Sequence, residues 1–320
     1  MSVPINDAIP NLSNEEYHNG LPWKEYLSSS QLKLYAHSPK YARFIMDNPQ
    51  EQTEAMRFGS LFHSAMQLFQ QHGTIDAFWD SVAIFTPPKN PKTNQSYGNT
   101  TKAYTEAYAQ FLADNKGKEI ATLAEAQQIA DMVGTLVQPE VGGTTARQVL
   151  KLLKWGKPEV SIFYETEDGI KLKVRPDLLT SSKIIDWKTT NLLDLTEESI
   201  NRAILNYGYH ISASMYQWVC HKIYGKWMTF ILVFVQKQSP YDCVMVDMSN
   251  YGYRFIRELE MVQPGPGALE FEKLLKLHTE CTKENHWPGA ETFIPSDTFK
   301  HRIMQIEPPR YYTNKFIEDY

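Results

Sequence analysis

The residues of this chain with the clearest chemical potential are two aspartates and a lysine, Asp177, Asp186 and Lys188. They lie in two short segments, residues 173–180 and 184–190, which are rich in Val, Ile, Leu and Thr and therefore predict β-strands. Two serines between the segments provide a turn, so the sequence predicts a hairpin. Carboxylate oxygens are ligands that Mg²⁺ prefers, and a nearby lysine can position an attacking water and offset charge on a phosphate.

The alternation of side chains along a strand decides whether these groups can meet. Asp186 and Lys188 share one face of their strand, while Trp187 between them points to the other face. If the hairpin brings Asp177 opposite the same face, two carboxylates and one ammonium converge, as metal-assisted phosphodiester hydrolysis requires. The alternative is a surface hairpin with a solvated ion pair, because Asp-x-Lys is a common pattern in strands.

Two further residues are candidates for the same site. Glu159 begins an alternating segment, residues 159–164, that predicts a strand, and it is either a third carboxylate of the site or an exposed strand end. His63 lies in a strongly apolar segment, residues 56–69, that predicts a buried helix. It is either a core histidine with one hydrogen bond or a metal ligand through an imidazole nitrogen. Spacing in the sequence leaves both readings open.

Composition narrows the class of protein. The chain has 42% hydrophobic and 22% charged residues, which is typical of a soluble globular protein. No apolar run reaches the roughly 18 residues that a membrane span needs, and the first residues lack the pattern of a signal peptide. We therefore expect a cytosolic protein that does not associate with a membrane. Three widely spaced cysteines argue against a disulfide framework, a structural zinc site and a four-cysteine iron-sulfur site: Cys220, Cys243 and Cys281.

The net charge of -5 is unusual for a protein that binds nucleic acid, because phosphates are contacted by Lys and Arg. Basic residues nevertheless gather around the predicted hairpin, so a basic face on an acidic body is possible. The alternative is that they are solvated exteriors of strands and helices. The members of this basic cluster are Lys151, Lys154, Lys157, Lys171, Lys173, Arg175, Lys183 and Lys188.

Hydrophobic periodicity predicts the order of the elements. Helices are expected at residues 31–36, from Pro39, at 56–69, at 102–114, from Leu123 until shortly before Pro139, at 201–205 and at 211–224. Strands are expected at 159–164, 170–175, 184–190, 229–235 and 243–246, the first three forming consecutive antiparallel strands, and a long interrupted helix is expected from Gly252. Residues 1–26 contain too many Pro, Asn and Gly for any period and predict an irregular segment.

Five ordered sequence blocks resemble the RecE-type exonucleases. This is the exonuclease VIII group of the PD-(D/E)XK superfamily, which is related to phage lambda exonuclease and to the RecB nuclease domain. The blocks are Phe58–His63, Pro158–Phe163, Arg175–Leu179, Ile185–Thr190 and Tyr207–Ile211, with weaker likeness at Leu27–Leu32 and Trp287–Gly289. The resemblance therefore extends over most of the chain.

The resemblance implies an α/β fold with a restriction-endonuclease-like core, in which helices flank a central mixed sheet and a helical region precedes it. We expect one nuclease domain over residues 27–290, helical up to about residue 155 and containing the catalytic sheet from about residue 156. The irregular segment 1–26 would precede it and a tail, residues 291–320, would follow.

The resemblance also implies an activity. It suggests a Mg²⁺-dependent exonuclease, with Mn²⁺ able to substitute, that degrades linear double-stranded DNA from 5′ to 3′ and leaves 3′ single strands for recombination. His63, Asp177, Asp186 and the carbonyl of Trp187 would be metal ligands, Lys188 would serve the attacking water, and Glu159 would be an additional acid. We also expect DNA contacts from Ser212, Tyr216 and Arg175. The partners would be DNA ends, a ring-shaped homotrimer or homotetramer and a RecT-type annealing protein in the cytosol of a bacterium or a phage-infected host.

One position departs from the family pattern. Ser212 stands where such enzymes usually have a glutamine four residues before a tyrosine, here Tyr216, although Gln217 follows directly. A serine is too short to make the same contact. Two other classes of function stay open: a structure-specific or restriction-type endonuclease of the same superfamily, and a non-catalytic scaffold that binds DNA ends.

Overall fold

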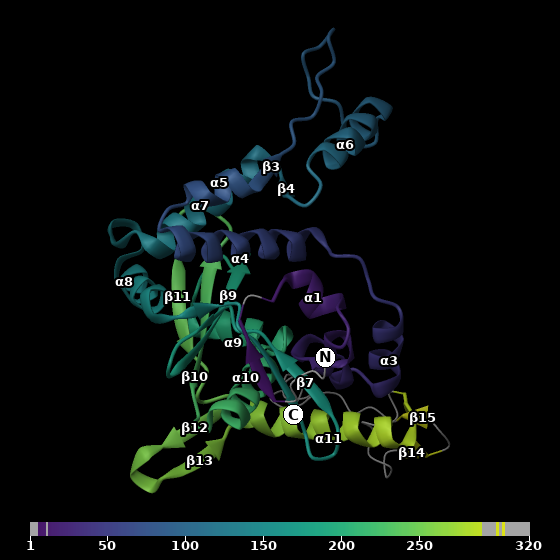
Figure 1. Cartoon of the computed structure of the whole chain (residues 1–320), viewed down its shortest axis with the longest axis vertical. Coiled ribbons are helices and arrows are strands. Elements are labelled where there is room, and N and C mark those ends of the chain that lie inside the picture. The colour runs from purple at the N-terminus through teal and green to yellow at the C-terminus, as the bar shows by residue number, and fades with distance from the viewer. Residues whose placement is uncertain (1–5, 11, 290–298, 301–302, 305–320) are drawn as a thin grey trace, which may run out of the picture. The chain divides into compact units, whose positions relative to one another are not determined.

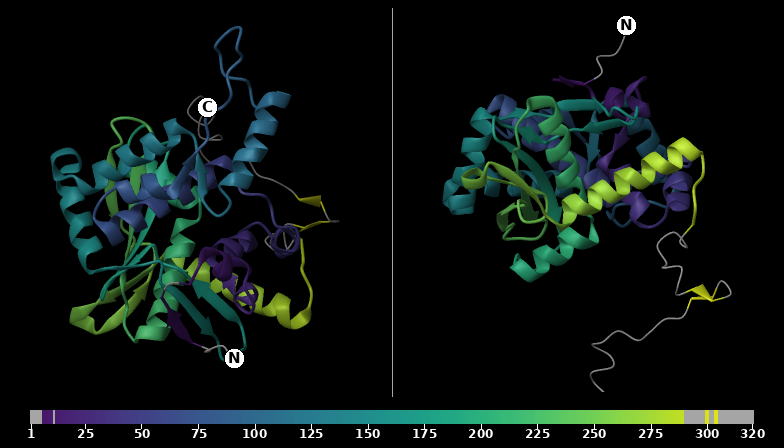
Figure 2. Two further views of the ribbon diagram at one scale, coloured as in Figure 1. Left: turned by 45° about the horizontal axis from the view of Figure 1, so that its top comes forward. Right: turned by 90° about the horizontal axis from the view of Figure 1, so that it is seen from below.

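The computed structural model describes residues 6–10, 12–289, 299–300 and 303–304 (Figures 1 and 2). The chain divides into two compact units, one drawing on residues 1–30 and 50–273 and the other on residues 31–49 and 274–320. The first unit contains both larger sheets and all the candidate site residues. Most of the predicted tail, residues 291–320, lies outside the described residues.

The larger sheet of the first unit has five strands in the order β11–β10–β9–β8–β5. Their bounds are β5 (Lys157–Pro158), β8 (Leu178–Leu179), β9 (Lys183–Thr190), β10 (Thr229–Gln236) and β11 (Cys243–Asp247). β9 and β10 are parallel, whereas the other neighbours are antiparallel, so the sheet is mixed as predicted. β10 is a continuous apolar run and is buried on both faces.

Helices cover both faces of this sheet (Figure 1). They are α4 (Glu54–His72), α7 (Leu123–Val137), α8 (Pro139–Trp155), α9 (Glu197–Asn206) and α10 (Tyr209–Tyr224). Ile231, Val233 and Val235 of β10 pack in one core with α4, α7 and α8. The intervening residues face the other way, where Phe230 contacts the ring of Tyr216 in α10. Helices on both sides of a mixed sheet confirm the α/β fold predicted from the sequence.

A second sheet has four strands in the order β1–β6–β7–β2. Their bounds are β1 (Asp7–Ile9), β2 (Leu27–Ser28), β6 (Ser161–Glu165) and β7 (Lys171–Val174). The prediction that residues 1–26 are irregular is therefore wrong for their described part, which also forms α1 (Asn14–Asn19) and η1 (Trp23–Glu25). The ring of Trp23 stacks on Phe163 of β6 at a centroid distance of 3.9 Å. Aromatic packing on the sheet, which periodicity does not report, orders this segment.

The predicted hairpin at the candidate site is shorter than expected. Only Leu178 and Leu179 pair with β9, opposite Ile185 and Ile184. Upstream of Pro176, which cannot donate to a strand ladder, the chain belongs to the other sheet. The prediction of three consecutive antiparallel strands is therefore wrong, because β6 and β7 pair with each other in one sheet while β8 and β9 pair in the other.

Two other segments differ from the prediction. Pro139 lies beyond the end of α7, as predicted, but it also occupies the first turn of α8, a helix that was not predicted, where its missing N–H is not needed. The long helix expected from Gly252 is a hairpin of β12 (Tyr253–Ile256) and β13 (Met261–Pro264). Glu260 in its turn has a left-handed backbone, with φ of 47°, which a helix cannot include. Helix α11 (Pro266–Glu284) begins only after this hairpin.

The remaining helices expected at residues 31–36, from Pro39 and at 102–114 lie close to their predicted positions, whereas a helix at 76–81 was not predicted. A few short elements complete the described part of the chain. They are α2 (Ser29–Lys33), η2 (Leu34–Ala36), α3 (Pro39–Asp47), α5 (Asp76–Ser81), β3 (Val82–Ile84), α6 (Lys102–Asp114), β4 (Glu119–Ala121), η3 (Arg257–Leu259), β14 (Phe299–Lys300) and β15 (Ile303–Met304). In the second unit, the hydroxyl of Tyr35 lies 2.8 Å from Nδ1 of His278. Among the described helices, none combines the length and apolar character that crossing a membrane requires.

Candidate active site

Glu159 and Asp177 lie at the two places where the chain crosses between the sheets. β5 and β8 belong to the five-stranded sheet, whereas β6 and β7 belong to the four-stranded sheet. The two crossings are adjacent, since the N–H of Glu159 donates to the carbonyl of Asp177 at 3.3 Å. Glu159 has a left-handed backbone, with φ of 49°, which is uncommon for a residue with a side chain. Both acidic side chains line the same cavity, so the crossing of the sheets brings two distant carboxylates together.

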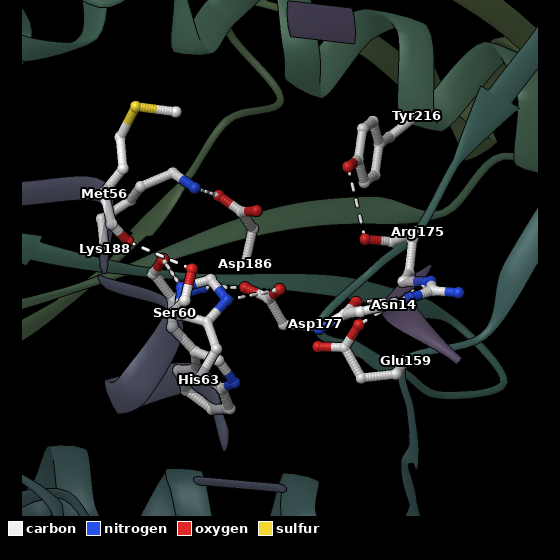
Figure 3. Close-up of polar contacts among 11 residues, drawn as sticks. Asn14, Met56, Ser60, His63, Glu159, Arg175, Asp177, Asp186, Lys188 and Tyr216 are labelled. Carbon is white, nitrogen blue, oxygen red and sulfur yellow. Dashed lines mark hydrogen bonds and ion pairs between the residues drawn. The ribbon is translucent and has the colours of Figure 1, made fainter. Parts of the chain in front are cut away.

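The edge of β9 supplies the next part of the site. Because β8 is only two residues long, the ladder between β8 and β9 ends at Ile185, and side chains bind the backbone of Trp187 instead. The N–H of Trp187 donates to Oδ2 of Asp177 at 2.6 Å, and its carbonyl lies 3.1 Å from Nε2 of His63. His63 projects from α4, and its Nδ1 lies 3.0 Å from Oδ1 of Asp177 (Figure 3). A short strand therefore leaves room for an imidazole and a carboxylate at this edge.

Asp186 and Lys188 lie side by side, as the alternation of the strand predicted. Nζ of Lys188 is 2.5 Å from Oδ2 of Asp186 (Figure 3). Trp187 between them is 3% exposed and packs in the core on the opposite face. The Lys188 ammonium also lies 5.3 Å from the ring centroid of Tyr209. The sequence contained no signal for this last contact, because Tyr209 and Lys188 come from different elements.

These side chains fit a divalent cation. One ligand atom each from His63, Glu159 and Asp177 lies within 4.8 Å of the other two. Carboxylate oxygens with one imidazole nitrogen are donors that divalent ions such as Mg²⁺ and Mn²⁺ accept. Asp186, which the sequence also suggested as a ligand, is instead turned toward Lys188. The structure thus brings together all the predicted site residues of β9 and α4. Glu159, predicted only as an additional acid, lies close enough to His63 and Asp177 to share a metal ion with them.

The charges of the site show why it would bind a cation. Burial and repulsion by Asp177 raise the pKa of Glu159 to about 7, and the same two causes raise the pKa of Asp186 in spite of Lys188. Burial favours a low pKa for His63, but the charge and hydrogen bond of Asp177 outweigh it and raise the pKa to about 9. Burial opposes ionisation of Asp177, yet His63 and Lys188 hold its pKa below the usual range. A bound cation would relieve the repulsion among these carboxylates.

A cavity of about 550 Å³ extends from His63, Glu159 and Asp177. The N-terminal segment forms one wall, through residues 12–14, 17–18 and 28–30. The polar face of α4 forms another, because helical spacing places several side chains on the same side as His63. These residues are Ser60, Ser64, Gln67 and Gln71. The site therefore opens into a polar space rather than onto a flat surface.

Arg175 and Lys173 are buried, although both belong to the predicted basic cluster. Nε of Arg175 donates to Oγ of Ser161 at 2.9 Å, and its terminal nitrogens donate to Oδ1 of Asn14 at 2.7 Å and to the carbonyl of Leu12 at 2.9 Å. Lys173 donates to two backbone carbonyls of the same N-terminal segment. The expected basic face is therefore smaller than the sequence suggested. Its exposed lysines are Lys151, Lys154, Lys157 and Lys183.

Ser212 and Tyr216 lie on one face of α10, as residues four apart in a helix do. The hydroxyl of Tyr216 donates to the carbonyl of Arg175 at 3.3 Å, and its ring lines the cavity (Figure 3). Gln217 does not compensate for Ser212. It is fully buried, and its amide is hydrogen-bonded to both backbone groups of Tyr253. DNA contacts by Arg175, Ser212 and Tyr216 stay predictions.

Residues 28–292 match the model of a family described as "PDDEXK-like domain of unknown function (DUF3799)". The chain belongs to this family. A crystal structure from Eubacterium rectale, described as "Putative exonuclease", is similar over 95% of this chain and 98% of its own, with a TM-score of 0.50 and 15% identity. At that identity the likeness shows the fold alone. Among curated proteins, none matches this chain.

Membership of a PDDEXK-like family places the protein in the PD-(D/E)XK nuclease superfamily. The RecE-type group within this superfamily stays a prediction from the sequence blocks. The pattern of that name occurs here as Pro176-Asp177 followed by Asp186-Trp187-Lys188. Nucleases of this superfamily depend on divalent metal ions, which agrees with the ligand atoms gathered at His63, Glu159 and Asp177. The protein is a nuclease-fold protein with a candidate site for metal-dependent hydrolysis.

Proposed function

We propose that this protein is a Mg²⁺-dependent exonuclease that degrades linear double-stranded DNA from 5′ to 3′ and leaves 3′ single strands for recombination. One observation supports hydrolysis of a phosphodiester. The side chains of three acids and of His63 and Lys188 converge at the edge of β9, the acids being Glu159, Asp177 and Asp186. The exonuclease part is supported by the resemblance of the sequence blocks to RecE-type enzymes and by the description of the Eubacterium rectale protein. Mn²⁺ is expected to substitute, since both ions accept oxygen ligands.

A bound Mg²⁺ would polarise the scissile phosphate and make a water molecule more acidic. His63, Glu159 and Asp177 would hold the ion, with the carbonyl of Trp187 on the same edge as a further oxygen. Asp186 would join them on release from Lys188, because the charge of the ion would offset the burial and the repulsion by Asp177 that raise its pKa. Binding of the ion requires a neutral His63 and therefore displaces its proton.

Lys188 acts as a donor. Burial disfavours its charge, but Asp186 and Asp177 outweigh burial and hold its pKa above the usual range, so the side chain is an ammonium at neutral pH. An ammonium donates a hydrogen bond to a lone pair of the attacking water, which orients that water, and its charge stabilises negative charge on the phosphate.

The substrate would be held mainly through its phosphates, so little sequence preference is expected. The exposed lysines of α8 and of the strands at 157 and 183 are the basic side chains available for such contacts. By the same resemblance, we propose a ring-shaped trimer or tetramer that encloses the duplex, and a RecT-type annealing protein as a partner in the cytosol.

Cleavage of linear and closed circular duplex in Mg²⁺ tests this proposal. Wild type should release mononucleotides from linear DNA and leave circles intact, with a label at the 5′ end released before a label at the 3′ end. Duplexes with a 5′ phosphate and with a 5′ hydroxyl are compared. Lys188→Ala should lose about 100-fold or more in rate, as when one transition-state donor is removed. Lys226→Ala removes a lysine from an exposed turn and should behave as wild type.

The other outcomes identify other functions. Cutting of closed circles by wild type would indicate an endonuclease of the same superfamily. Binding of DNA ends without cleavage would indicate a scaffold. Unchanged activity in Lys188→Ala would refute the assignment of the site.

A further inference from the structure

Two tyrosines form a stack that begins at the lysine of the site. The ring centroid of Tyr209 lies 5.3 Å from Nζ of Lys188, and the ring of Tyr207 stacks on Tyr209 at 5.5 Å with the planes inclined by 29°. The inner ring also contacts Phe234 of β10 at 6.1 Å. Tyr209 is half-buried, whereas Tyr207 is 64% exposed. The outer ring therefore presents an aromatic surface to solvent next to the site.

The backbone between the two rings explains why they stack. Tyr207 follows the end of α9, Tyr209 begins α10, and Gly208 between them has a left-handed backbone with φ of 63°. Glycine adopts this conformation readily, and other residues do not. In an uninterrupted helix, side chains two residues apart point roughly 200° apart. The break at Gly208 instead allows both rings to face the same way.

The inner tyrosine links this stack to the chemistry. Tyr209 places the face of its ring near the Lys188 ammonium, and such a ring attracts a cation. Burial raises the pKa of Tyr209 more than the lysine lowers it, so its hydroxyl stays neutral. A phosphate contacted by Lys188 would thus lie close to Tyr209, the inner ring of the stack. Tyr207 is the outer ring and is exposed to solvent.

We propose that Tyr207 is a stacking site for a nucleobase of the substrate, at one of the two nucleotides next to the scissile phosphate. This inference rests on the proposed action on DNA. Every base has a π face, so stacking on tyrosine tolerates all sequences, as a non-specific nuclease requires. Within a duplex both faces of a base are already covered, so the site fits a base that is unpaired or at the end of the duplex.

Binding without cleavage tests the proposal separately from the nuclease activity. A linear duplex carries 2-aminopurine, whose fluorescence falls on stacking, at the first or second nucleotide of its 5′ end, and binding is measured in EDTA. Wild type and Tyr207→Phe should quench the fluorescence at one of these positions. Tyr207→Leu, which keeps an apolar side chain without a ring, should not quench it and should bind about fivefold or more weakly. Tyr224→Leu, at the far end of α10, should behave as wild type.

An abasic nucleotide at the quenched position provides a second measurement. It should weaken binding to wild type by the same factor as Tyr207→Leu, and it should cause no further loss in that variant, because the two changes remove one contact. Losses that multiply would overturn the proposal, as would the absence of quenching by wild type at both positions. Because neither measurement involves cleavage, a failed stacking site and a failed nuclease assignment are distinguishable.

Discussion

Replacing Arg175 by methionine separates the two roles that sequence and structure suggest for it. The sequence predicted a DNA contact, whereas the structure has a side chain that is 7% exposed and donates to Ser161, Asn14 and Leu12. Methionine retains much of the volume but none of the donors. The substitution therefore leaves three acceptors without this partner and detaches the N-terminal segment from β6.

The size of the effect follows from these contacts. Each buried acceptor that loses its partner costs ~1–3 kcal/mol, and breaking a buried charged network costs ~3–5 kcal/mol in total. Glu159, whose carboxylate lies 3.9 Å from Nε of Arg175, also loses a nearby positive charge. We expect Arg175→Met to lower the free energy of unfolding by ~3–5 kcal/mol, which for 320 residues is a decrease in Tm of about 4–7 °C.

Urea unfolding and limited proteolysis measure this change. The N-terminal segment of Arg175→Met should be cleaved at protease concentrations that leave wild type intact. The matched control is Arg202→Met, whose exposed guanidinium pairs with Glu198 one helical turn away and should contribute about 0.5 kcal/mol or less. Wild-type stability in Arg175→Met, together with weaker DNA binding and a shallower salt dependence, would refute the structural role and favour the DNA contact.

Three further predictions concern the site and its surroundings. In metal-free protein, the His63–Asp177 pair should contribute its full free energy of unfolding below pH 6.5, and this contribution should be lost as pH rises through the folded His63 pKa of about 9. Urea unfolding across this pH range should show a loss of ~3 kcal/mol or less in wild type and none in His63→Gln. Mg²⁺ should raise the Tm of wild type but not of Asp177→Asn, and an equal rise in both would locate the ion elsewhere. Gln217→Leu should cost ~3 kcal/mol by leaving the backbone groups of Tyr253 and the carbonyl of Met228 unpaired, yet retain activity at low temperature; selective loss of activity would mean that Gln217 serves the site.

Much of the fold could be predicted because its signals are local. The stripe of α7, the apolar run of β10 and the alternation of β9 each follow from neighbouring residues. The same rules failed at the described part of residues 1–26 and at β12–β13. In the N-terminal segment, Trp23 is ordered by packing on a strand more than a hundred positions away, and no local period records such a contact.

The sequence by itself determined the identities of the acids and the shared face of Asp186 and Lys188, because these depend on residue type and on the two-residue period of a strand. The mixed sheet between helices was predicted from the family resemblance of the sequence blocks. Only the tertiary structure decided which groups meet. Two crossings between sheets bring Glu159 beside Asp177, and a short β8 leaves the Trp187 backbone open to His63. Burial likewise turned Arg175 from an expected surface charge into an internal anchor. Such contacts join segments far apart in the chain, and their energies depend on the packing around them rather than on the order of residues.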